Sequence, residues 1–133
     1  MDQKMNRKEL GNKGETVANV FLMKHGFRVI QRNYLKKCGE IDIIALKDKK
    51  LHFVEVKSVT RVAGAQSRCY RTNFRPEDNV HSQKIARMKR TIQIYLAEHH
   101  IDPDLEFACD IACVYLDIEK RVGKVRMIWD VIL

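Results

Sequence analysis

The chain has 133 residues, enough for one domain with a buried core, and its 45% hydrophobic content agrees with a globular protein rather than a disordered one. The net charge of +8 favours a polyanionic partner, nucleic acid first and an anionic membrane surface second; a merely basic protein is the plainer alternative. No stretch approaches the roughly 18 apolar residues that span a bilayer, and the N-terminus carries no apolar signal region. We therefore expect a cytoplasmic protein that does not bind membranes.

The first half of the sequence predicts one helix followed by three strands. Apolar residues with helical spacing predict a helix from about residue 11 to 25, closed by a left-handed cap at Gly26. Segments rich in β-branched residues then predict strands at residues 27–32, 40–46 and 51–57. Residues 33–39 predict a basic loop, and residues 47–50 a short turn that makes a β-hairpin of the last two strands.

The second half predicts one more helix and two strands. Residues 59–79 have no clear period, which is typical of a lid or binding loop. An amphipathic pattern predicts a helix over residues 82–99, which Pro103 terminates. Strands are expected at residues 106–115, with Asp110 as a weak candidate acid, and at 125–132. The order αβββαβ, followed by one more strand, predicts a single layered α/β domain.

The register of the predicted hairpin follows from its turn. If the turn has two residues, Asp42 lies opposite Glu55 and Glu40 lies opposite Lys57. Opposed residues project from one face with Cβ atoms about 5 Å apart, so three carboxylates and a lysine would form one cluster. Both faces of the hairpin are otherwise apolar, which indicates a strand pair that is covered on both sides.

The predicted cluster suits metal-assisted phosphate chemistry. Asp42 and Glu55 can together hold one hard divalent ion, Mg²⁺ or Mn²⁺, with water and phosphate oxygens completing its shell. Lys57 would orient or deprotonate the attacking water, or neutralise charge on the phosphate. Ordinary cross-strand ion pairs are the alternative, but charges beside a buried sheet are costly unless they are paired or bound to metal.

An aspartate followed after about a dozen residues by Glu-x-Lys, here IDIIALKDKKLHFVEVK, resembles the PD-(D/E)XK nuclease superfamily. The resemblance implies a restriction-endonuclease-like α/β core with a central mixed sheet flanked by helices. LGNKGETVANVFLMKHGFRVIQRNY, GEIDIIA, FVEVK and a helix ending in IYL are similar, more narrowly, to the YraN-like family, whose members resemble archaeal Holliday junction resolvases. The resemblance covers nearly the whole chain.

The resemblance implies a metal-dependent endonuclease acting on DNA, including branched or structured DNA. Carried over by position, it makes Asp42 and Glu55 the metal ligands and Lys57 the catalytic lysine. It adds Glu15, in the motif KGETVA, as an outer ligand or water-orienting acid, and Glu40 as a further site acid. The plainer interpretations are a helix-start glutamate favoured by the helix dipole and a salt bridge from Glu40 to Lys57.

Two departures from the superfamily pattern are visible. Ile41 stands where a proline usually precedes the aspartate, and SVTR follows EVK in place of an arginine, so Arg61 is the expected replacement contact. Further cations are expected to bind the phosphate backbone without choosing a sequence. They are Arg68, Arg71, Arg75, Lys84, Arg87 and Arg90. A solvated charged surface is the alternative for these residues.

Three functions remain open at this point: an active endonuclease, a nucleic-acid-binding module with a nuclease fold and little turnover, and a protein-interaction module with incidental basic charge. The intact residues Asp42, Glu55 and Lys57 favour the first. The likeness to resolvases implies a homodimer. The four cysteines favour buried thiols over a zinc site, because Cys109 and Cys113 would lie roughly 13 Å apart along one strand.

Overall fold

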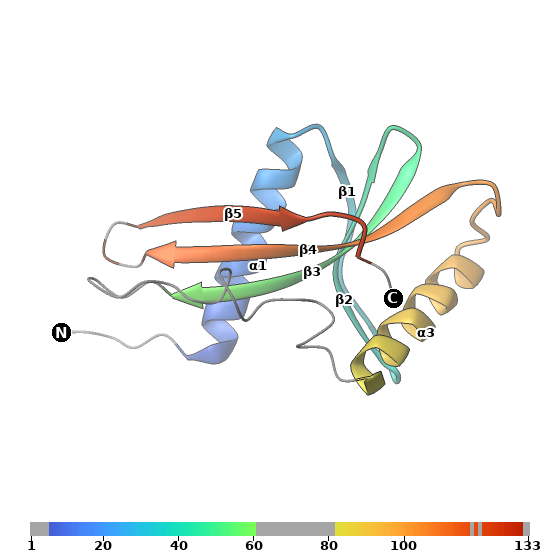
Figure 1. Cartoon of the computed structure of the whole chain (residues 1–133), viewed down its shortest axis with the longest axis horizontal. Coiled ribbons are helices and arrows are strands. Elements are labelled where there is room, and N and C mark those ends of the chain that lie inside the picture. Colours follow the sequence, from blue (N-terminus) through green and yellow to red (C-terminus); the bar gives the residue numbers. More distant parts are fainter. Residues whose placement is uncertain (1–5, 61–81, 118, 120, 132–133) are drawn as a thin grey trace.

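The computed structural model describes residues 6–60, 82–117, 119 and 121–131 (Figure 1). Its elements are α1 (Arg7–Lys24), β1 (Arg28–Lys36), β2 (Gly39–Lys47), β3 (Lys50–Thr60), α3 (Ser82–Glu98), β4 (Glu106–Asp117) and β5 (Val122–Ile128). The strands form one sheet in the order β1-β2-β3-β4-β5, in which β3 and β4 are parallel and the other neighbours antiparallel. A mixed sheet flanked by two helices confirms the predicted α/β class.

Local sequence sets both ends of α1. The Asn6 side chain accepts a hydrogen bond from the Glu9 amide at 2.8 Å, so the helix begins four residues earlier than the apolar spacing predicts. At the other end Gly26 adopts a φ of 87°, and the Phe27 amide donates to the Leu22 carbonyl at 3.0 Å. This left-handed cap confirms the role predicted for Gly26.

The predicted basic loop at residues 33–39 is wrong. β1 continues to Lys36, and the chain turns at residues 37–38 before β2 begins at Gly39. Tyr34 explains the difference, because its ring is buried and packs edge-on against Tyr95 of α3 at 5.2 Å between ring centroids. Tertiary packing thus extends a strand that its basic composition disfavours.

The turn between β2 and β3 has the predicted register. Lys47 pairs with Lys50, and the two turn residues, Asp48 and Lys49, have φ values of 50° and 61°. Positive φ at both central residues is the signature of the two-residue turn that matches the twist of a hairpin. The ladder runs inward from this turn to the pair Ile43↔Val54.

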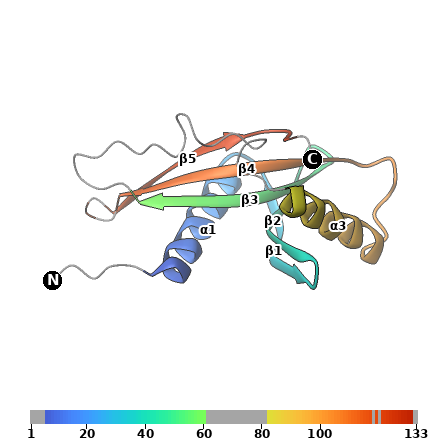
Figure 2. The same ribbon diagram turned by 60° about the horizontal axis from the view of Figure 1, so that its bottom comes forward.

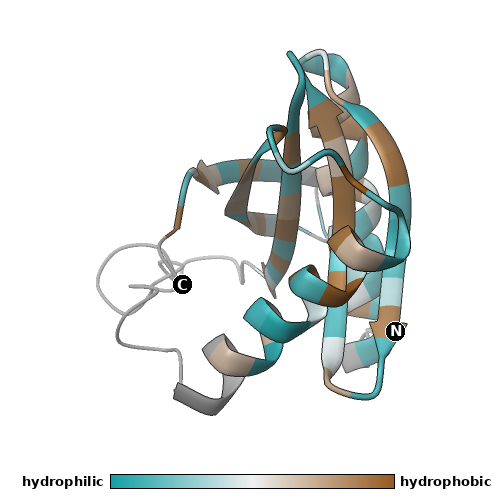
Figure 3. Ribbon diagram, turned by 90° about the vertical axis from the view of Figure 1, so that its right-hand side faces the viewer, coloured by the Kyte–Doolittle hydropathy of each residue, from teal (hydrophilic) through white to brown (hydrophobic). Residues whose placement is uncertain are grey.

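Two hydrophobic clusters cover the sheet, one under each helix. The cluster under α1 includes Ala18, Leu22 and Val54, and the cluster under α3 includes Phe53 and Ile92. Figure 2 shows the outer part of the β1–β2 hairpin leaving the sheet between the two helices. In Figure 3 α3 is coloured as a mixture of hydrophilic and hydrophobic residues, as the amphipathic pattern predicts. Neither described helix is both long and apolar enough to cross a bilayer.

Polar contacts join the segment after β5 to the middle of the sheet. Asp110 of β4 is fully buried, and its two carboxylate oxygens accept hydrogen bonds from His52 Nδ1 at 2.6 Å and from the Asp130 amide at 3.0 Å. The Trp129 ring lies parallel to the Phe27 ring at 5.7 Å. Asp110 therefore anchors the C-terminal segment, while β5 itself starts and ends a few residues before its predicted bounds.

Candidate active site

Asp42 lies where β2 separates from β3. The ladder between these strands ends at Ile43↔Val54, and beyond it the Asp42 Oδ2 atom accepts a hydrogen bond from the Val56 amide at 2.8 Å. The carboxylate thus satisfies an amide that a continued ladder would pair with backbone. This holds the acid at the fork between the two strands.

The pairings predicted for Asp42 with Glu55 and for Glu40 with Lys57 lie beyond the β2–β3 ladder, which ends at Ile43↔Val54. On its other edge β2 stays paired with β1, where Glu40 lies opposite Leu35. The acids predicted for the site still lie close together, because the acidic part of β2 and the adjacent part of β3 meet at the fork.

β2 changes faces at Asp42. Residues two apart on a strand normally share a face, yet Ile41 packs in the cluster under α3 and Ile43 in the cluster under α1. Asn33, which is level with Asp42 in β1, has a φ of 53° in the left-handed region. The hairpin therefore bends at this level, and the acid sits at the bend.

Four carboxylates interact at the fork. The pKa of Asp42 is raised to about 6; burial is the largest cause, the hydrogen bond from the Val56 amide lowers it, and the negative charges of Glu15, Glu55 and Glu40 add to the rise. Such mutual repulsion is relieved when a cation binds among the acids. The four acids expected at the site are therefore close enough to influence one another.

Glu15 reaches this cluster from α1. Burial raises its pKa, Arg32 lowers it, Glu40 raises it, and a hydrogen bond from the Asn33 side chain lowers it. Its Oε1 atom is buried and has no hydrogen-bond partner among the described residues. Arg32 also donates from Nη2 to the Thr16 hydroxyl at 3.4 Å, which keeps this cation beside the middle of α1.

Lys57 lies next to Glu55 on β3. Its Nζ atom is 3.2 Å from Glu55 Oε1, and both side chains are partly exposed, by 36% and 21%. Neither side chain is fully covered, so a bound substrate can reach both of them. The Glu-x-Lys motif therefore presents an acid and an ammonium group together, as predicted.

A close approach of α1 to β3 sets the distance of Glu15 from the fork. A Cβ atom on Gly14 would stand 1.6 Å from Ser58 Oγ and 2.8 Å from Ser58 Cβ. Only glycine fits a helix packed this tightly on a strand. The glycine before Glu15 is thus what lets α1 bring this acid to the fork between β2 and β3.

The donor set fits a divalent ion that keeps part of its own shell. No group of three or more His, Cys, Asp or Glu side chains within the described parts of the chain is arranged to hold a metal ion. Asp42 and Glu55 are nevertheless hard oxygen donors, and Mg²⁺ is commonly held by one or two carboxylates with waters and substrate phosphates. The unpartnered Oε1 atom of Glu15 is a further hard donor for such a water.

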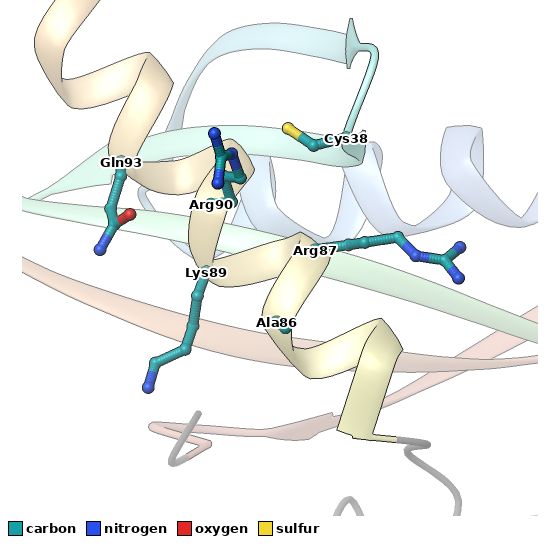
Figure 4. A pocket seen from close by; sticks show the side chains of 6 residues that line it. All are labelled: Cys38, Ala86, Arg87, Lys89, Arg90 and Gln93. Atoms are coloured by element: carbon teal, nitrogen blue, oxygen red, sulfur yellow. The ribbon is translucent and has the colours of Figure 1, made fainter.

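The basic residues predicted to grip phosphate are only partly visible. Arg87 and Arg90 lie on α3 and line a hollow beside the turn of the β1–β2 hairpin (Figure 4). Lys84 belongs to α3, but its side chain is outside the described residues. The remaining predicted cations also lie outside them: Arg61, Arg68, Arg71 and Arg75.

Sequence patterns missed three contributors to the site. Arg32 and Asn33 were assigned to the end of a strand and to a loop, and neither carries a motif that points to Glu15. The Val56 amide is a backbone group and leaves no trace in side-chain patterns. The one sequence signal for Asn33 is its position between two strand-like segments, because glycine and asparagine adopt the left-handed conformation most readily.

Comparison with known proteins places the chain in a family. The profile of the uncharacterised protein family UPF0102 matches residues 14–121, which include the whole acid cluster. A UPF0102 protein of Campylobacter fetus subsp. fetus is 41% identical over 115 residues, 86% of this chain and 91% of that protein. A UPF0102 protein of Caldicellulosiruptor bescii is 31% identical over 126 residues, 95% of this chain and 98% of that protein. The chain is therefore a member of UPF0102, the YraN-like family.

Proposed function

We propose that this protein is a metal-dependent endonuclease that hydrolyses phosphodiester bonds in DNA. The observation that carries the proposal is the position of Asp42, held at the fork by the Val56 amide and surrounded by Glu15, Glu40 and Glu55. A cluster of acids at the fork between two strands is unfavourable by itself and is stabilised by a divalent cation.

Each acid has a distinct place in the proposed site. Asp42 and Glu55 are the direct ligands, and Glu15 orients a water from the side of α1. A bound Mg²⁺ or Mn²⁺ would polarise the scissile phosphate and lower the pKa of the attacking water. Glu40, which is exposed and sits at the outer side of Asp42, adds negative charge that strengthens cation binding.

Lys57 acts on the phosphate or on the attacking water. Its ammonium group is 3.2 Å from the Glu55 carboxylate, so a cation bound by that carboxylate would weaken this ion pair and leave Lys57 able to contact the substrate. A lysine in this position stabilises the negative charge that builds up on the phosphate during hydrolysis.

The test is a cleavage assay with linear and branched DNA, with Mg²⁺, with Mn²⁺ and with chelator. We expect cation-dependent cleavage by the wild type and a loss of at least about 100-fold in rate for Asp42→Asn and Lys57→Ala. Glu106→Gln, an exposed acid at the start of β4, is the matched control and should keep wild-type activity. Equal cleavage by wild type and Asp42→Asn would reject the assigned site.

A nucleic-acid-binding module without turnover is the second candidate. The observation that favours it is that no three-donor metal group occurs among the described residues. Calorimetric titration with Mn²⁺ separates the two functions. A nuclease should bind Mn²⁺ through Asp42 with affinity that falls as the pH drops below about 6, because that carboxylate must lose its proton to act as a ligand.

A further inference from the structure

A basic hollow lies between α3 and the turn that joins β1 to β2, outside the acid cluster. It has a volume of about 360 Å³ and is lined by Cys38, Ala86, Arg87, Lys89, Arg90 and Gln93. In Figure 4 Arg90 ends near Cys38, whereas Arg87 and Lys89 extend away from it in different directions. The lining of the hollow therefore combines the small side chains of Cys38 and Ala86 with three cationic ones.

The wall formed by the turn is held in place. A Cβ atom on Gly39 would lie 3.0 Å from Thr91 Oγ1 and 3.6 Å from Arg87 Cβ, so the turn packs closely on α3. Cys38 Sγ is 3.3 Å from the same Thr91 hydroxyl. The hollow is thus formed before any ligand arrives, which lowers the entropic cost of binding.

A second set of contacts fixes the hairpin to the far end of α3. The Glu98 carboxylate accepts hydrogen bonds from the Tyr34 hydroxyl and, at 2.7 Å, from Lys36 Nζ. Tyr34 and Lys36 pair across the hairpin with Ile41 and Gly39, so these contacts restrain the strand that leads into Asp42. The hollow and the acid cluster are therefore parts of one restrained hairpin.

Charge identifies the class of partner. Three of the six lining residues are cations, and none of those six is acidic. The turn connects the hollow directly to Glu40, whose charge influences Asp42. A polyanion held in the hollow therefore lies beside the hairpin that carries the acid cluster.

We infer that this hollow binds an unpaired segment of the nucleic acid strand next to the bond that is cleaved. The inference rests on the proposed function, since it takes nucleic acid as the partner. Arg87, Lys89 and Arg90 contact phosphates of the strand, and one unstacked nucleoside enters the hollow, whose lining includes Cys38. In a duplex the bases are stacked inside and cannot enter, whereas single strands, flaps and junctions offer unstacked bases.

The experiment measures binding separately from cleavage. Fluorescence anisotropy in chelator compares a labelled single strand of about 12 nucleotides with a duplex of the same sequence. We expect the wild type to prefer the single strand. Arg87→Ala/Arg90→Ala should weaken single-strand binding roughly tenfold and lower the slope of log affinity against log salt by about 1.4, which corresponds to two lost phosphate contacts.

The matched control removes two exposed cations near the opposite end of β1, Lys24 at the end of α1 and Arg28 at the start of β1. Lys24→Ala/Arg28→Ala has the same change in net charge and should bind within about twofold of wild type. An equal loss in both double variants would overturn the inference, because it would show only a charge effect. Equal affinity for duplex and single strand, or displacement of the strand by polyglutamate, would also overturn it.

Alkylation of Cys38 reports directly whether a strand occupies the hollow. Alkylation of this partly exposed thiol, followed by peptide mass spectrometry, should slow when the single strand is bound to wild type and should not slow in Arg87→Ala/Arg90→Ala. Unchanged alkylation in wild type would overturn the inference.

A protein that binds through these arginines but never cleaves supports the hollow and rejects the nuclease. Cleavage that depends on Asp42, together with unchanged single-strand binding by Arg87→Ala/Arg90→Ala, supports the nuclease and rejects the hollow.

Discussion

Asn33 of β1 and Asp42 of β2 lie at the same level of the hairpin, and both strands change faces there. Asn33 adopts a left-handed backbone conformation, while Asp42 places its carboxylate on the Val56 amide of the neighbouring strand. The bend and the acid therefore form one unit. This unit separates β2 from β3 at the point where the carboxylates meet.

Asn33→Ala should destabilise the protein more than Asn33→Gly. Alanine in the left-handed region costs about 1 kcal/mol, whereas glycine adopts this region freely, and both lose the side-chain contact with Glu15. Urea denaturation measures the difference. If the two variants are equally stable, the backbone conformation of Asn33 does not hold the bend, and the contact with Glu15 accounts for the loss.

Asp42→Asn should stabilise the protein at neutral pH. Because the folded pKa of Asp42, about 6, lies above its ordinary range, the folded state binds the proton more tightly than the unfolded chain does. The stability from this group is present at low pH and is lost as the pH rises through about 6. We expect a gain of about 1 kcal/mol at pH 7 and little change near pH 4, from urea unfolding without added cation. The same gain at both pH values would contradict this assignment.

Gly14→Ala should be strongly destabilising, by at least about 2 kcal/mol, because the added methyl group meets Ser58. Gly11→Ala is the control in the same helix, where a Cβ atom meets nothing within 4 Å, and it should stabilise by about 0.5 kcal/mol. Adding Ser58→Gly to Gly14→Ala should recover part of the loss, as thermal denaturation of wild type, Gly14→Ala, Ser58→Gly and the double variant will show. Additive effects would mean that the two residues do not interact.

Asp110→Ala should loosen the C-terminal segment. The substitution leaves the His52 ring and the Asp130 amide without their buried acceptor, at a cost of about 2 kcal/mol. Trp129, the chain's single tryptophan, stacks on Phe27 nearby and should report the change in its fluorescence. Asp110→Asn keeps an acceptor and should retain most of the signal. Identical spectra for Asp110→Ala and wild type would refute the anchoring role.

Much of the central hairpin could be predicted from sequence. Turn residues and the alternation of apolar side chains give the register from Lys47↔Lys50 to Ile43↔Val54, because both depend on neighbours close in the chain. The helix cap at Gly26 is local in the same sense. These features need no knowledge of the rest of the fold.

The bend at Asp42 could not be predicted in this way. Tyr34, next to the bend, packs against Tyr95, a contact between residues far apart in the chain, whereas a simple period of two continues the strand straight through. Glu15 has no periodic signal either, and only the family resemblance placed it at the site. Its approach depends on α1 docking on β3 through Gly14 and Ser58.

The parallel pairing of β3 with β4 also has a consequence for how the chain reaches this structure. Its partners, such as Lys50 and Glu106, are more than fifty positions apart, whereas the β1–β2 and β2–β3 turns join residues that are nearly adjacent. Pairs that close long loops form slowly compared with local turns. We therefore expect the three-stranded meander to assemble early and the central parallel ladder to be the late, rate-limiting event of folding.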